Sequence, residues 1–117
     1  MANAAIVVLA GTDGHENLGR VVNALETARE FAEADEELRL IFDGAGTTWV
    51  PALEDPTHDY HELYQSVREH AAVCDYCSSA FDVADAVDAA GLATLDEHDG
   101  HPSIRRLVDE GYEVITF

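Results

Sequence analysis

Apolar runs alternate along the chain with segments whose apolar residues recur at helical spacing. Ala5–Ala10 (AIVVLA) is apolar at every position, as expected of a strand buried on both faces of a sheet. After a polar loop, apolar residues recur three and four positions apart, which predicts an amphipathic helix over 17–34. Leu38–Phe42 (LRLIF) predicts the second strand.

The same alternation continues to the end of the chain. A helix is expected from Tyr60 onward, with Asp59 and Glu62 as a capping pair at its N-terminus. The other expected elements are strands at 71–75, 92–95 and 112–117, a helix over 80–90, and a last helix that begins at Pro102 and stops at Gly111. This order predicts an α/β fold with a mostly parallel sheet, in a single domain over residues 1–117.

The composition is strongly acidic. The chain has 24 Asp and Glu, 6 Arg and no Lys, which gives a net charge of −18. Such a surface repels nucleic acids and anionic membranes, so direct binding of either is disfavoured. The chain has no run of 18 apolar residues and no basic leader, so we expect a cytoplasmic protein without a membrane anchor.

The acidic residues are spread along the sequence and do not form a tail. At about 1 M salt the Debye length falls to about 3 Å, and the mutual repulsion of such charges is largely screened. The composition therefore resembles that of proteins from salt-loving archaea. An ordinary acidic domain that binds a basic partner is the alternative interpretation.

Ligands of parallel α/β sheets gather beyond the carboxyl ends of the strands. Three loops are expected there, at 11–20, 43–49 and 74–79, and together they are the candidate walls of one site. In the first loop His15 and Arg20 are candidate ligand contacts, although Arg20 stands where a phosphate-binding loop would need Lys. Trp49 and Tyr76 are candidate aromatic walls, and both would also suit a core or a subunit interface.

The strongest chemical signal is the Cys74–Cys77 pair, a C-x-x-C formed by the only two cysteines. The pair follows the expected third strand and opens a helix. A thiolate at a helix start is stabilised by the helix dipole, so we expect a lowered thiol pKa, although Asp75 opposes this effect. A dithiol centre and two buried cysteines that pack as small apolar residues are both compatible with this pattern.

A zinc site is a third interpretation. His58 and His61 precede the cysteines and supply, with them, the four ligands that a structural zinc needs. Here the two histidines precede the two cysteines, whereas in the familiar zinc finger the cysteines come first. His98 and His101 repeat the same interval, so chance alone readily produces it in this sequence.

Several of these features together resemble the DsrE/DsrF-like family, which includes the subunits of the TusBCD sulfur relay. They are the apolar first strand, the polar loop that opens a long helix, the cysteine after the third strand (VCDYC) and the terminal VITF strand. Several family members continue the C-x-x-C with a small residue, Arg and Gly. In this chain Phe81 and Asp82 replace that Arg and Gly.

The resemblance implies a three-layer α/β/α sandwich with about five strands, assembled as a homotrimer or hexamer. It also implies that Cys74 accepts sulfane sulfur as a persulfide, with Cys77 as the resolving thiol. Donor and acceptor proteins of the sulfur would then be the partners, and no cofactor or metal is required. A binding module for a small ligand or a protein, with structural cysteines, is the alternative from another functional class, beside the zinc-stabilised domain.

Overall fold

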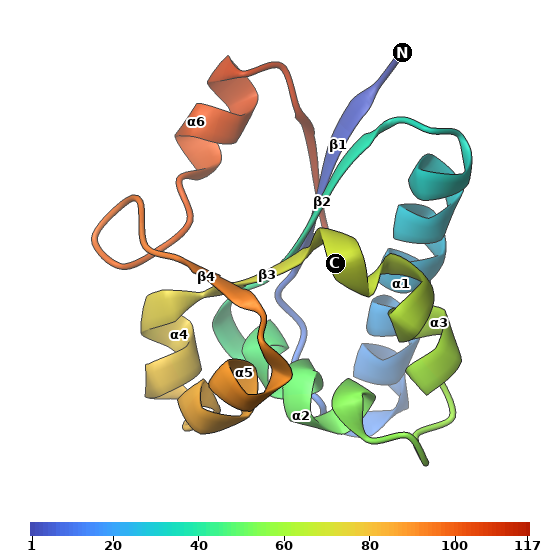
Figure 1. The fold of residues 1–117 in the computed structure, drawn as a ribbon, viewed down its shortest axis with the longest axis vertical. Helices are drawn as coiled ribbons and strands as arrows, with labels where there is room; N and C mark the ends of the chain where they lie inside the picture. The colour runs from blue at the N-terminus through green and yellow to red at the C-terminus, as the bar shows by residue number, and fades with distance from the viewer.

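A five-stranded parallel sheet forms the centre of the computed structural model, which describes residues 1–117 (Figure 1). The strands lie in the order β4-β3-β2-β1-β5, and each neighbouring pair is parallel. Their bounds are Asn3–Val8 (β1), Glu37–Phe42 (β2), Ala71–Cys74 (β3), Ala93–Leu95 (β4) and Glu113–Thr116 (β5). The predicted α/β fold with a sheet of about five parallel strands is confirmed.

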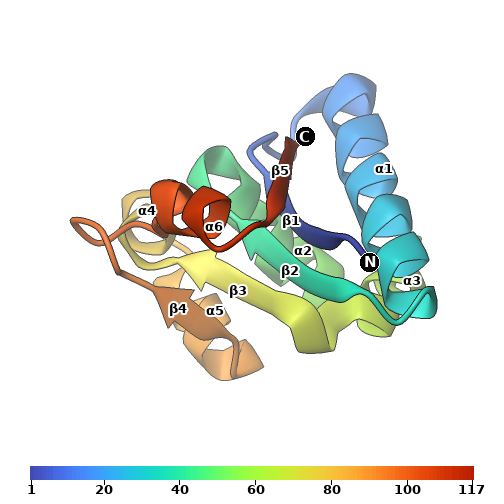
Figure 2. The same ribbon diagram turned by 90° about the horizontal axis from the view of Figure 1, so that it is seen from above.

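Helices cover both faces of the sheet and complete a three-layer α/β/α sandwich (Figure 2). Their bounds are Gly14–Glu33 (α1), Trp49–Glu54 (α2), His61–Val67 (α3), Asp75–Ala80 (α4), Ala84–Ala90 (α5) and Ile104–Asp109 (α6), with short 3-10 helices at Gly44–Thr48 (η1) and Arg68–His70 (η2). None of these helices has the length and apolar character needed to cross a membrane.

The two faces of the sheet are covered unequally. Ile6 and Val8 of β1 belong to a cluster of 17 buried residues, to which α1, α2, α3 and α5 contribute. Ala5 and Val7 point to the other face, where four buried residues, including Leu107 of α6, form a much smaller cluster. One face therefore carries the main core, and the other is covered by α6 alone (Figure 2).

The helix expected over 80–90 is two helices. α4 ends at Ala80 and α5 begins at Ala84. Between them Asp82 has φ +58°, a left-handed conformation that a continuous right-handed helix cannot contain. The helical spacing of the apolar residues spans this break, so it gave no sign of the turn.

Two expected helix starts are also wrong. α3 begins at His61 after Tyr60, and no side chain caps it, so Asp59 and Glu62 do not form the expected capping pair. α6 begins at Ile104, where the side chain of Ser103 accepts a hydrogen bond from the backbone of Arg106. Pro102 therefore lies before the cap and is not the first residue of the helix.

A close contact between backbones fixes the loop after β2. A Cβ atom added at Gly46 in η1 would lie 2.0 Å from the carbonyl oxygen of Val8. Only glycine therefore allows η1 to lie this close to the end of β1. The backbone N–H of Asp43 donates to the same carbonyl at 2.9 Å, which fixes the start of the loop beside β1.

Candidate functional site

Cys74 and Cys77 lie at the turn from β3 into α4. Cys74 is the last residue of β3, and its extended backbone (φ −61°, ψ 121°) is that of a residue that caps a helix. Its Sγ accepts a hydrogen bond from the backbone N–H of Cys77, with an N–S distance of 3.4 Å. The expected placement of the C-x-x-C pair between the third strand and a helix is confirmed.

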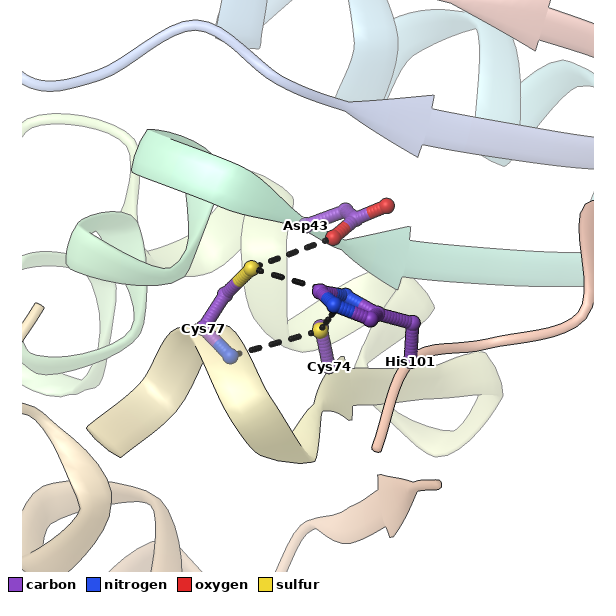
Figure 3. Close-up of side chains that lie close together, drawn as sticks. All are labelled: Asp43, Cys74, Cys77 and His101. Carbon is purple, nitrogen blue, oxygen red and sulfur yellow. Dashed lines mark hydrogen bonds between the residues drawn. The ribbon is translucent and has the colours of Figure 1, made fainter. Parts of the chain in front are cut away.

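The imidazole of His101 lies against both thiols (Figure 3). Its Nδ1 is 3.4 Å from Sγ of Cys74 and 4.0 Å from Sγ of Cys77. His101 belongs to the segment between β4 and α6, where its backbone pairs with that of His98 in a tight turn. Within this turn the carbonyl of Gly100 accepts a hydrogen bond from the Cys74 thiol, with an S–O distance of 3.8 Å. One turn thus places an imidazole and a carbonyl at the same sulfur.

Asp43, the residue that follows the neighbouring strand β2, closes the site (Figure 3). The Cys77 thiol donates to its Oδ1 at 3.6 Å, and this oxygen also accepts from the backbone N–H of Gly44 at 2.8 Å. One side-chain atom of each of Asp43, Cys74, Cys77 and His101 lies within 4.8 Å of the other three. We call these four residues the cysteine cluster. Three segments far apart in the sequence meet here, at the carboxyl edge of the sheet.

The two thiols differ in exposure, and burial changes the acidity of Cys74. Cys74 has no exposed surface, and Cys77 retains 8%. Burial raises the pKa of Cys74 to about 12; the backbone N–H of Cys77 opposes this rise, and the Cys77 side chain and the Asp43 carboxylate add to it. The expectation that the helix start lowers the thiol pKa is therefore wrong for Cys74. A single amide donor does not compensate for the loss of hydration.

Tyr76 is the expected aromatic wall that lies beside the cluster. Its ring centroid is 4.8 Å from that of His101, with 40° between the planes. The residue is exposed, and with Gly100 it lines a shallow hollow of about 410 Å³. Gly100 lines this hollow, and its carbonyl contacts the Cys74 thiol. Gly100 is therefore the residue that lies between the hollow and the thiol.

The other three expected ligand contacts are not part of the cluster. His15 and Trp49 line a second hollow of about 360 Å³ at the start of α1. Trp49 is almost fully buried, and its indole N–H donates to the carbonyl of Ala10 at 2.9 Å. Its side chain therefore packs in the hydrophobic core. Arg20 forms an ion pair with Glu16 at 2.7 Å on the exposed surface of α1.

The histidines of the zinc interpretation do not reach the thiols. Nδ1 of His61 lies 2.6 Å from the carbonyl oxygen of Leu53, and Nδ1 of His58 accepts from the backbone N–H of Tyr60 at 3.1 Å. Both rings thus form hydrogen bonds with backbone groups in and between α2 and α3. The groups that surround the thiols are those of His101 and Asp43.

Sequence reasoning overlooked His101 and gave Asp43 no role. Asp43 is the first residue of the loop 43–49, which the sequence places at the site, and this position is the signal for its carboxylate. His101 belongs to a pair with the same interval as His58 and His61, and this interval alone does not single it out. The available signal was the predicted parallel sheet, because the loop that follows the expected fourth strand then emerges at the same edge as the cysteines.

The residues that replace the family's Arg and Gly lie at the end of α4. Phe81 follows the last residue of the helix and is 44% exposed, so it offers no positive charge to an anion here. Asp82 has φ +58°, in the region that favours glycine. The backbone therefore keeps a conformation typical of glycine at this position, although the residue is Asp.

Comparisons with known proteins agree with this architecture. The sequence model of the DsrE/DsrF-like family matches residues 3–117. An uncharacterised protein of Methanocaldococcus jannaschii is 26% identical over 99 residues, which are 85% of this chain and 81% of that protein. A solved structure, that of a conserved protein of unknown function from Bacteroides thetaiotaomicron, superposes with a TM-score of 0.62. That match covers 97% of this chain and 94% of the other at 13% identity, and it shows a shared fold.

Proposed function

The chain belongs to the DsrE/DsrF-like family, and from that premise we propose that it carries sulfane sulfur as a persulfide on Cys74, with Cys77 as the thiol that releases it. The family is associated with sulfur relay. The observation that carries the proposal is the approach of one imidazole to two thiols, with His101 Nδ1 at 3.4 Å from Cys74 and 4.0 Å from Cys77. A thiol with a base in reach is the arrangement of an activated sulfur nucleophile.

Burial raises the pKa of the Cys74 thiol, so in the loading step Nδ1 of His101 takes up the thiol proton at the moment of attack. The Cys74 thiolate attacks the terminal sulfur of a persulfide on the donor, so a new S–S bond forms and the S–S bond of the donor breaks. The donor leaves as a thiolate and takes up the proton. His101 lies closer to Cys74 than to Cys77, and the backbone N–H of Cys77 points at the Cys74 sulfur, which supports Cys74 as the carrier.

In the release step, Cys77 attacks Sγ of Cys74 and expels the outer sulfur as hydrosulfide. The two cysteines lose two electrons and form a disulfide, and the sulfane sulfur gains those electrons. The two sulfur atoms lie within 4.8 Å of each other, so side-chain rotation is enough to bring them together. A dithiol reductant then restores the pair.

Burial suits a carrier of a labile group. Cys74 is fully enclosed, so a persulfide on it is shielded from thiols in bulk solution. The hollow beside Tyr76 and Gly100 gives a small donor, or an extended segment of a donor protein, a place to approach. Donor and acceptor proteins are the partners that this function requires.

The experiment is intact-mass spectrometry of the reduced, metal-free chain before and after a sulfane-sulfur donor is added. We expect a gain of one sulfur, about 32 Da, which disappears in Cys74→Ser. Cys77→Ser should load sulfur and fail to release it. His101→Ala should load more slowly, and His98→Ala, a change in the same turn, should load at the wild-type rate. No mass gain in any form would contradict the proposal and favour a binding module with structural cysteines.

Self-association, as a homotrimer or hexamer, is the second part of the proposal. Six residues of α6 are the only helical cover of one face of the sheet, and on this helix Val108 is 60% exposed and Ile104 is 37% exposed. Packing of this face against another copy would cover both side chains. Light scattering should show an oligomer that Val108→Asp shifts toward a monomer, and a monomeric wild-type chain would contradict this part.

A further inference from the structure

The geometry points to a zinc site in the cysteine cluster, with one ligand atom from each of Asp43, Cys74, Cys77 and His101. This inference goes beyond sulfur transfer, because it concerns a metal ion that binds the two thiols when they carry no sulfur, and it needs no persulfide chemistry. The four residues offer a carboxylate oxygen, two sulfurs and an imidazole nitrogen, all within 4.8 Å of one another. Four side-chain ligands of these types are what a closed tetrahedral zinc site uses.

Two of the distances between the ligand atoms already match a tetrahedral zinc site. Zinc lies about 2.3 Å from sulfur and about 2.0–2.2 Å from nitrogen or oxygen, so tetrahedral ligand atoms lie roughly 3.4–3.8 Å apart. Nδ1 of His101 is 3.4 Å from Sγ of Cys74, and Oδ1 of Asp43 is 3.6 Å from Sγ of Cys77. The distance from Nδ1 of His101 to Sγ of Cys77 is 4.0 Å. The other pairs of ligand atoms lie within 4.8 Å of each other, so zinc binding requires the cluster to contract by up to about 1 Å at its longest edge.

The ligands are held by the backbone of separate elements. The C-x-x-C turn places both sulfurs on one side through the bond from the Cys77 N–H to Sγ of Cys74. The Oδ1 atom of Asp43 is fixed by the N–H of Gly44. His101 is held by two backbone hydrogen bonds with His98, at 2.8 and 2.9 Å. A zinc ion would therefore connect β2, β3 and the segment before α6.

The chemical type of the ligand atoms determines which metal ion the cluster binds. Two thiolates and an imidazole are soft and borderline ligands that favour zinc over magnesium or calcium. With all four positions taken by side chains, no site remains for a reactive water, so the ion is structural. The net charge of −18 raises the local concentration of cations around the chain. In the zinc-bound chain both thiols are occupied, so metal and persulfide exclude each other.

Cobalt(II) is the direct probe, because it replaces zinc and reports its ligands by colour. We expect the reduced, metal-free chain to bind one cobalt per chain, with thiolate charge-transfer bands and the intense visible absorption of tetrahedral geometry. One equivalent of zinc should bleach both. A weak octahedral spectrum, or no stoichiometric binding, would overturn the inference.

Variants assign the ligands. His101→Ala should weaken zinc binding by at least about 100-fold, since loss of an outer partner alone costs roughly 10–100-fold. His98→Ala in the same turn should bind as the wild type does. Asp43→Asn keeps the shape of the side chain, so it serves if His101→Ala does not fold, and it should change the cobalt spectrum. Equal zinc affinity in His101→Ala and His98→Ala would exclude His101 as a ligand and refute the assignment.

The two proposals on this cluster fail separately. A chain that takes up sulfur and binds no zinc refutes only the metal site. A chain that binds zinc and takes up no sulfur when the metal is removed refutes only the carrier function.

Discussion

A single glycine sets the position of the histidine that serves both thiols. Gly100 has φ +85°, and a Cβ atom added there would lie 3.3 Å from the Cβ of Tyr76. An L-residue in the left-handed region costs about 1–2 kcal/mol, and here the new methyl group also pushes against a neighbour. The turn would relax by moving the adjacent imidazole of His101.

We therefore predict that Gly100→Ala slows sulfur loading and lowers the free energy of unfolding by about 1–2 kcal/mol. Gly91→Ala is the matched control, because Gly91 has φ +71° and no atom within 4 Å of its added Cβ, at a helix end outside the cluster. Urea unfolding should show a loss of stability in both variants. Loading should be slower only in Gly100→Ala, and equal loading rates in the two would contradict the role of the turn.

At the scale of elements, the backbone of η1 at Gly46 lies directly against the backbone at the end of β1. The added Cβ at Gly46 would lie 2.0 Å from a carbonyl oxygen, a contact that neither backbone can avoid without moving. We predict that Gly46→Ala destabilises the chain by at least about 2 kcal/mol. Gly19→Ala, on the exposed surface of α1 with no atom within 4 Å of the added Cβ, should be neutral or stabilising by up to about 1 kcal/mol. A Gly46→Ala variant as stable as the wild type in urea would show that the two elements are not in this contact.

A charged network joins the helices below the sheet. Glu54 of α2 accepts hydrogen bonds from Tyr64 of α3 and from Arg68 of η2, and the guanidinium of Arg68 also reaches the carbonyl of Ala90 in α5. Burial alone would raise the pKa of Glu54, but the bonds from Arg68 and Tyr64 outweigh it and hold the pKa below its usual value.

The sign of the pH dependence follows from that lowered pKa. The stability that Glu54 contributes is present above the unfolded pKa of 4.5, and it is lost as the pH falls through the lower folded value. Glu54→Gln should therefore cost about 1–2 kcal/mol at neutral pH, and the two unfolding curves should converge below pH 4.5. A gap between wild type and variant that stays constant to strongly acidic pH would contradict this.

The sequence predicts the elements with a strong pattern better than the turns that join them. The C-x-x-C turn appears where it was expected, and the first strand and the long helix appear within three residues of their expected bounds, because burial periodicity and a two-residue gap are local signals. The strand spans Asn3–Val8 where 5–10 was expected, and the helix spans Gly14–Glu33 where 17–34 was expected. The break at Asp82 and the cap at Ser103 depend on single backbone angles and hydrogen bonds, which periodicity does not encode.

In the site, too, the residues with a local signal in the sequence are predicted and their long-range neighbours are not. Both cysteines were found, because their spacing is visible in the sequence. His101 lies 27 positions from Cys74, and only the pairing of β4 with β3 brings it there. Asp43 reaches Cys77 across 34 positions through the pairing of β2 with β3. Such long-range neighbours follow from strand order, which the sequence alone did not specify.

For the whole molecule, charge is the dominant property. The few arginines form local ion pairs such as Arg29 with Glu26 and Arg106 with Glu110, which leaves most of the acidic surface without a partner. Repulsion within that surface opposes the compact state in dilute buffer and is screened in concentrated salt. This is the physical basis of the expected high-salt origin.

We predict a higher melting temperature in about 3 M KCl than in about 0.1 M KCl, because the Debye length falls below about 3 Å at the higher concentration. Circular dichroism during heating measures both midpoints in the same preparation. Equal midpoints would contradict the interpretation of the composition as an adaptation to salt.

The central claim is that Cys74 carries the sulfur. Trypsin cleaves after Arg68 and Arg105, so one peptide contains both cysteines and His101. Tandem mass spectrometry of this peptide, after the metal-free chain has been loaded and alkylated, locates the added sulfur. The account predicts the extra sulfur, about 32 Da, on Cys74 in the loaded chain and a Cys74–Cys77 disulfide after release. Extra sulfur found only on Cys77, or on neither cysteine, would contradict it.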